Sequence, residues 1–176
     1  KKFLFLFLFI IITINSTMAD ERKNQLNKLF NDLKIGNNDL SFKIEKKIWN
    51  IWSTHPTNQK LTKMLAKGSD LVNINKFEDA IEIFSQVIKL DPSWAEAWNK
   101  RATALYLIGE FQKSQNDINK VLELEKRHFG ALAGQGLLRW THIDRLESSW
   151  PPWGLSPFVS VASWKVGSRH PTEGLP

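Results

Sequence analysis

The sequence contains no cysteine, which excludes disulfide bonds, a cysteine nucleophile and thiolate-bound zinc. It also lacks the Gly-x-Ser-x-Gly turn, the His-Glu-x-x-His zinc helix and the glycine-rich phosphate loop that mark common enzyme classes. Gly134-Gln135-Gly136 begins like a dinucleotide-binding loop, but Arg139 occupies the third glycine position. We therefore expect no enzyme activity and no cofactor.

Metal-binding and basic side chains are scattered. The four histidines, His55, His128, His142 and His170, lie far apart in sequence, so we predict capping or solvent exposure for them and no metal site. The net charge is +6, but the lysines form no one-sided stripe with interleaved aromatic residues. This pattern does not favour nucleic-acid binding.

One long apolar run is present, from Phe3 to Ile14, with two lysines before it and small residues up to Ala19 after it. This order is typical of a secretory signal at residues 1–19 that is cleaved after Ala19. Twelve helical residues reach about 18 Å, well short of a hydrocarbon core of about 30 Å. We predict export to the periplasm with no stable membrane span in the mature chain. The alternative is an inner-membrane anchor formed by an uncleaved signal.

Residues 61–94 and 95–128 are two consecutive 34-residue units whose landmark positions align without a gap. A period of this length is the signature of a solenoid of helical hairpins. Each unit has small residues where its two helices meet, apolar residues around the turn, and a break before the next unit. These landmarks are Gly68, Leu71, Phe77, Ala80, Phe84, Pro92, Trp98, Ala102, Leu105, Gly109 and Ser114.

Several landmarks have a direct physical role. Gly68 and Ala80 let the paired helices of the first unit approach closely, and their counterparts do the same in the second unit. We expect Phe84 to point away from its own hairpin partner and to fill the gap before the next unit. Pro92 cannot continue a helix, and Gly109 supplies a left-handed turn.

Two further helices are predicted before the repeats, because apolar residues recur there at helical spacing. The apolar positions are Leu26, Leu29, Phe30 and Leu33 in residues 20–35, and Leu40, Ile44, Ile48 and Trp52 in the next helix. Asp39 can cap this second helix. We expect the resulting hairpin, within residues 20–57, to cover the first repeat as an N-terminal cap.

A third unit begins at residue 129, since Gly136 falls one period after Ala102. Its second helix would occupy about residues 144–156, but two prolines and a glycine there prevent a continuous helix. We therefore predict an incomplete third repeat and an irregular tail, rich in tryptophan and proline, over residues 141–176. The abrupt change in composition fits a frameshifted or chimeric end, and a native flexible tail is the alternative.

The landmark pattern resembles the tetratricopeptide repeat family. The resemblance implies an all-α solenoid of helical hairpins over residues 58–140 and a role in binding other proteins. Ala95-Glu96-Ala97-Trp98-Asn99 and Arg127-His128-Phe129-Gly130-Ala131 also resemble small exported tetratricopeptide proteins of Gram-negative bacteria, alphaproteobacteria in particular. This narrower resemblance falls on His128, for which we expect a hydrogen bond that fixes the loop between repeats.

In tetratricopeptide proteins the first helix of each hairpin lines a concave groove. Beside the packed face of these helices, the present sequence has amides, hydroxyls, one phenol and aliphatic side chains. The expected groove residues are Leu65, Ser69, Val72 and Asn73 in the first repeat, and Asn99, Thr103 and Tyr106 in the second. Such a groove suits an extended peptide or a partner helix, and it lacks the lysines of a carboxylate clamp.

These features together predict an exported scaffold or adaptor that binds a protein or peptide partner in the cell envelope. One alternative is a structural subunit of a homo-oligomer that is held together through the incomplete third repeat. The other is an accessory protein to an envelope hydrolase or peptidase.

Overall fold

The structure is a computed structural model that describes residues 20–35 and 38–146 of the 176-residue chain. Over these residues the fold has seven helices and no strand, which confirms the predicted all-α class. The predicted signal segment and the tail beyond residue 146 lie outside the described residues. In the described ranges, no helix is both long enough and apolar enough to cross a membrane.

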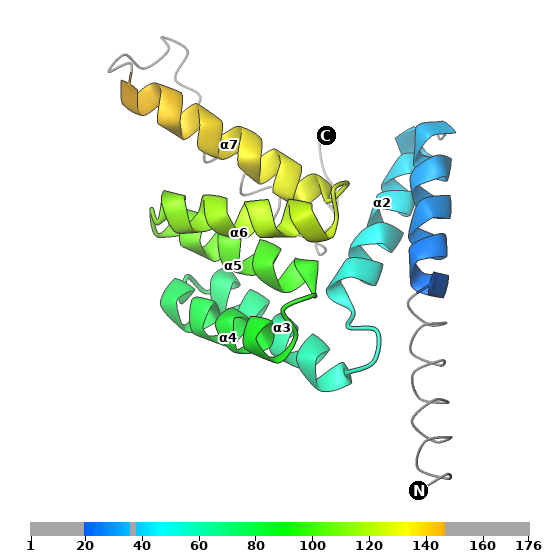
Figure 1. Cartoon of the computed structure of the whole chain (residues 1–176), viewed down its shortest axis with the longest axis horizontal. Helices are drawn as coiled ribbons and strands as arrows, with labels where there is room; N and C mark the ends of the chain where they lie inside the picture. The colour runs from blue at the N-terminus through cyan, green and yellow to red at the C-terminus, as the bar shows by residue number, and fades with distance from the viewer. Residues whose placement is uncertain (1–19, 36–37, 147–176) are drawn as a thin grey trace, which may run out of the picture.

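Five helices form the repeat domain, and they stack in chain order (Figure 1). The first hairpin consists of α3 (Gln59–Asn73) and α4 (Phe77–Leu90). The second consists of α5 (Ala95–Leu107) and α6 (Phe111–Leu124), and α7 (Phe129–Leu146) packs on α6. The two predicted repeats are thus two helical hairpins, and the third unit contributes its first helix.

The turns of the two hairpins use equivalent positions with left-handed backbone. Gly109 has a φ of 81°, as predicted, and Asn75, one period earlier, has a φ of 60°. Asparagine tolerates this conformation better than most other residues with a Cβ. The third unit has Ile143 at this position, and β-branched residues rarely adopt left-handed backbone. In agreement with this, α7 continues to Leu146 without a turn, so the prediction of an irregular tail from residue 141 onward is wrong for residues 141–146.

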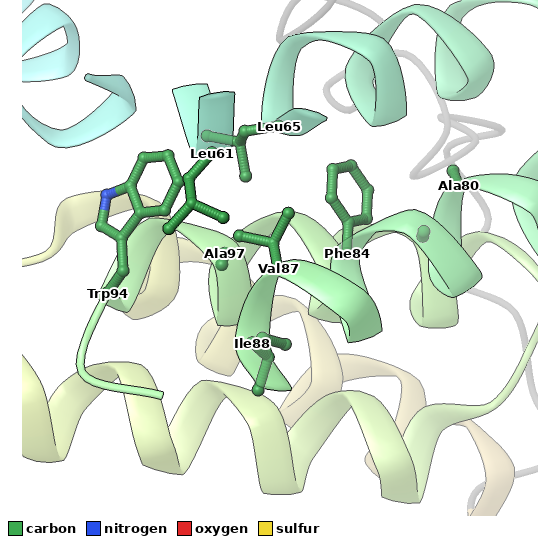
Figure 2. Close-up of a cluster of buried hydrophobic side chains, with 9 residues drawn as sticks. Leu61, Leu65, Ala80, Phe84, Val87, Ile88, Trp94 and Ala97 are labelled. Atoms are coloured by element: carbon green, nitrogen blue, oxygen red, sulfur yellow. The ribbon is translucent and has the colours of Figure 1, made fainter. Parts of the chain in front are cut away.

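The core of the first hairpin is built around the ring of Phe84, which is fully buried (Figure 2). A Cβ placed on Gly68 would lie only 2.4 Å from Phe84 Cε1, so the ring packs directly against α3. The prediction that Phe84 points away from its hairpin partner is therefore wrong. The same cluster includes Ala97 and Ala104 of α5, and so it also joins the first repeat to the second.

The second hairpin is closed by a hydrogen bond at its small-residue contact. Ser114 Oγ donates to the carbonyl oxygen of Ala102 at 2.8 Å, and both residues are buried. Leu105 is also buried, as its landmark position implies. Trp98 is only half-buried, and its Nε1 donates to the carbonyl oxygen of Pro92 at 2.9 Å. The prediction that Trp98 belongs to the buried stripe is therefore only partly correct.

The N-terminal hairpin consists of the helix over residues 20–35 and α2 (Asn38–Ser53), and it has a hydrophobic cluster of its own. Its buried members are Leu26, Leu29, Ile44, Ile48 and Trp52. Leu40 is 48% exposed in the first turn of α2, so its predicted core position is wrong. Asp39 lies inside this first turn, because α2 already begins at Asn38.

This hairpin packs beside the loops between repeats, at one end of the repeat helices (Figure 1). Trp94, just before α5, donates from Nε1 to the carbonyl oxygen of Trp52 at 2.8 Å. The Trp52 ring stacks on His128, just before α7, with ring centroids 4.1 Å apart. The hairpin therefore bridges both connections between repeats, whereas we expected a cap over the first repeat.

Candidate functional site

A cavity of about 330 Å³ lies between α5, α6 and α7. One wall comes from α5, the floor from α6 and the other wall from α7. The lining residues are Asn99, Ala102, Thr103 and Tyr106; Ser114 and Ile118; and Gly130, Ala133, Gly134, Leu137 and Trp140. None of these eleven described residues carries a charge.

The cavity brings together the second-repeat half of the predicted groove, namely Asn99, Thr103 and Tyr106. The first-repeat half lies elsewhere. Leu65 is 2% exposed inside the core of the first hairpin, so its prediction as a groove residue is wrong. The remaining first-repeat residues, Ser69, Val72 and Asn73, do not line the cavity.

The opposite wall was not predicted, although the repeat contained the signal for it. Its main side chains, Ala133, Leu137 and Trp140, lie one 34-residue period after Asn99, Thr103 and Tyr106. Equivalent repeat positions on α5 and α7, the first helices of two successive units, thus form the two walls.

Most polar groups of the cavity already bond within the chain. Asn99 is 7% exposed, and its Nδ2 donates to Glu96 Oε2 at 3.3 Å. Thr103 Oγ1 donates to the carbonyl oxygen of Asn99 at 3.0 Å. Among the described residues, the hydroxyl of Tyr106 makes no hydrogen bond. Burial raises the pKa of this phenol, so it stays protonated and can donate to a ligand at neutral pH.

Small residues on α7 keep the cavity open and hold α7 close to its neighbours. A Cβ on Gly134 would lie 3.0 Å from Ile118 Cδ1, and one on Gly130 would lie 2.8 Å from the Trp49 ring. Trp140 is 63% exposed and therefore stands at the mouth of the cavity. A ligand would meet an aromatic rim before it reached the apolar interior.

A buried charged cluster supports the α5 wall. The Glu96 side chain is fully buried, and its Oε2 lies 2.9 Å from His128 Nε2. His128 Nδ1 accepts a hydrogen bond from the backbone N–H of Ala131 at 3.3 Å, so Nε2 carries the proton and donates to Glu96. His128 thus fixes the loop between repeats, as predicted, and also caps the start of α7.

Lys100 completes this cluster. Its Nζ lies 3.4 Å from Glu96 Oε1, although Oε1 accepts no hydrogen bond among the described residues. Burial by itself raises the pKa of Glu96, but Lys100 and His128 outweigh that effect and lower it. The carboxylate is therefore ionised at neutral pH, and it holds Asn99 in the cavity wall.

His55 has the capping role that the sequence predicted. Its Nδ1 accepts hydrogen bonds from the backbone N–H groups of Thr57 and Asn58, at 3.2 and 2.9 Å. Its Nε2 lies 2.8 Å from Asp91 Oδ2, which ties the start of the repeat domain to the loop after α4. The side chains of the other two predicted histidines, His142 and His170, lie outside the described residues.

Comparison with known proteins identifies the repeats. The tetratricopeptide repeat model matches residues 65–93 and 95–128, so the chain carries two tetratricopeptide repeats. Such repeats generally act as protein-interaction scaffolds. A TPR repeat-containing protein of Rhizobium etli is 30% identical over 130 residues, which cover 73% of this chain and 63% of that protein.

Two eukaryotic proteins match shorter stretches. Heat shock protein STI1 of Saccharomyces cerevisiae is 27% identical over 84 residues, which cover 48% of this chain and 14% of that protein. DnaJ protein P58IPK homolog B of Oryza sativa is 26% identical over 62 residues, which cover 35% of this chain and 13% of that protein. The chain thus spans less than two thirds of the length of each of these three relatives.

Proposed function

We propose that this chain is an exported scaffold that binds an uncharged, apolar segment of a protein partner in the cavity between α5 and α7. The observation that carries the proposal is the cavity itself, which two successive repeats line with equivalent residues and without a charge. Its volume of about 330 Å³ lies at the lower end of the range for ligand pockets. It suits one or two apolar side chains of an extended peptide or of a helix.

The chemistry of the walls defines what the partner presents. A charged side chain would lose its hydration in this cavity and find no opposite charge there, which is costly. An aliphatic or aromatic side chain would instead bury its surface against Leu137 and Trp140. The Tyr106 hydroxyl would donate to a backbone carbonyl of the partner, and rigid aromatic residues of this kind are enriched at binding hot spots.

The variant Leu137→Glu tests this proposal, because it places a carboxylate in the cavity wall. The matched control is Ile74→Glu, since Ile74 is 62% exposed after α3 and lies outside the cavity. Tagged protein would capture partners from a periplasmic extract, with quantitative mass spectrometry as the readout and circular dichroism as the check of folding. We leave Asn99 unchanged because it bonds to Glu96.

We expect the wild-type chain and the control to enrich the same partner, and Leu137→Glu to lose most of it. Tyr106→Phe should weaken capture to a smaller degree, because it removes only the hydroxyl. Undiminished capture by a folded Leu137→Glu variant would move the binding site away from this cavity.

Export is the second part of the proposal, and its support is the lysine pair and short apolar run within residues 1–19. N-terminal sequencing of the protein recovered from the periplasm should begin at Asp20. Recovery of the intact N-terminus in the membrane fraction would support the uncleaved-anchor alternative.

A further inference from the structure

A stripe of three residues recurs on the first helix of each repeat, at i, i+4 and i+8. It reads Met64, Gly68 and Val72 on α3; Trp98, Ala102 and Tyr106 on α5; and Leu132, Gly136 and Trp140 on α7. In the first two repeats this stripe faces the second helix of the same hairpin. In the third unit α7 has no such helix within the described part of the chain.

The covered stripes show what this surface accepts. On α3, Gly68 is buried under the Phe84 ring of α4, and Met64 and Val72 pack against the same core. On α5, Ala102 is 2% exposed and its carbonyl oxygen accepts the hydrogen bond from Ser114 of α6. In both hairpins the covering helix brings a small residue and, four residues later, a large apolar one.

The third stripe has the same register, and no described residue covers it. Leu132 is 47% exposed and Trp140 is 63% exposed. A Cβ on Gly136 would meet no described atom within 4 Å, in contrast to the crowded Gly68. The opposite face of α7 is docked, because Ala131 and Leu138 are buried in the core shared with α5 and α6.

We infer that this open face of α7 binds an amphipathic helix of a partner protein, which completes a third hairpin in trans. The partner helix presents a small residue and, four residues later, an aromatic side chain that packs on Gly136 as Phe84 packs on Gly68. This surface is separate from the cavity of the proposed function, although Trp140 borders both.

Two observations point to a different protein as the source of the helix. On the second helices of the described repeats, the residues with this pattern, Ala80 and Phe84 on α4 and Ser114 and Ile118 on α6, are each at most 3% exposed, so neither helix of a second copy is free to cover the stripe. Arg139 is exposed on α7 where the earlier repeats have the apolar Leu71 and Leu105. A partner helix with a carboxylate opposite Arg139 would complement this charge.

The chain itself supplies the probe for a binding experiment. A fluorescein-labelled peptide with the α4 sequence, Phe77–Leu90, carries the required pattern. Glu82 and Gln86 are exposed on α4, and Gln86 Nε2 donates to Glu82 Oε1 at 3.3 Å. A Gln86→Lys change in the peptide therefore allows a lactam bridge that stabilises the helix without touching the apolar face.

Fluorescence anisotropy would measure binding of this peptide to the full chain. We expect saturable binding that Gly136→Arg weakens at least tenfold, since arginine places a long charged side chain on this face and its Cβ meets no described atom within 4 Å. Phe84→Ala in the peptide should weaken binding to a similar degree. The cavity variant Leu137→Glu should leave the affinity within about twofold, which separates this inference from the proposed function.

Three results would overturn the inference. The first is the absence of saturable binding to the wild-type chain. The second is equal binding by a folded Gly136→Arg variant, which would mean that the peptide displaces the chain's own α4. The third is a concentration-dependent dimer in sedimentation experiments that Gly136→Arg dissociates, which would assign the face to self-association.

Discussion

Gly68 and Gly136 occupy equivalent positions in the first and third units, and alanine substitutions there should change stability in opposite directions. At Gly68 the new Cβ would lie 2.4, 2.8 and 2.9 Å from three atoms of the Phe84 ring. Carbon atoms in contact normally lie about 3.5–4.0 Å apart, so the ring would have to move by about 1 Å. Phe84 is fully buried, and the surrounding core leaves little room for that movement.

Two effects compete at Gly68. Alanine favours a helix over glycine by roughly 0.5–1 kcal/mol. Overpacking of a well-packed core costs about 1–3 kcal/mol, so we expect Gly68→Ala to lower the free energy of unfolding by about 1–2 kcal/mol. At Gly136 no described atom opposes the new Cβ, and the helix preference alone should raise the free energy of unfolding by roughly 0.5–1 kcal/mol.

Urea denaturation followed by helical circular dichroism would measure both variants. A third variant, Gly68→Ala combined with Phe84→Leu, tests the cause, because the smaller leucine makes room for the Cβ. This double variant should be more stable than the sum of the two single changes by about 1 kcal/mol. A stabilising effect of Gly68→Ala equal to that of Gly136→Ala would refute the close contact between α3 and α4.

Two further predictions concern the buried cluster and the repeat junction. Burial raises the pKa of Glu96, but Lys100 and His128 outweigh this and lower the pKa below its ordinary value of 4.5. The ionised carboxylate therefore stabilises the folded state above about pH 4.5. This stabilisation is lost as the pH falls through the pKa of the folded state. The urea midpoint of the wild-type protein should therefore fall as the pH is lowered, and the midpoint of Glu96→Gln should depend less steeply on pH. If the urea midpoints of the two proteins changed with pH in parallel, Glu96 would not be the group responsible. Trp98→Ala should cost about 1–3 kcal/mol, less than the roughly 3–5 kcal/mol for a fully buried aromatic residue, because Trp98 is only half-buried. The same urea titrations measure it, and a loss above 4 kcal/mol would show that Trp98 anchors the junction more strongly than its contacts indicate.

The hairpins and their boundaries could be predicted because their causes are local. The end of α4 at Leu90 follows from Pro92 two residues later, and the left-handed turn follows from Gly109. The helix over residues 20–35 follows from apolar spacing within a few turns. The run of α7 to Leu146 was not predicted, although it also has a local cause, since Ile143 stands where the second hairpin has its turn glycine.

The arrangement of these elements depended on contacts between distant residues. Trp52 stacks on His128, and Arg127 Nη1 donates to Asn27 Oδ1 across 100 residues of sequence at 2.9 Å. No periodic pattern in the N-terminal hairpin indicates that it bridges the two loops between repeats. The direction of Phe84 was mispredicted for the same reason, since spacing indicates a buried face but not which neighbouring helix covers it.

The candidate site depends both on local sequence and on contacts between distant residues. The sequence by itself determined the repeat, the first helices and the polar stripe of α5, because a 34-residue period places the same residues on the same helical face. Only the tertiary structure decided that Asn99, Thr103 and Tyr106 face α7, that Leu65 is buried, and that no described residue packs on Gly136. These outcomes depend on how far each hairpin rotates against the next, and that rotation is set by the packing of whole helices and not by any single stretch of sequence.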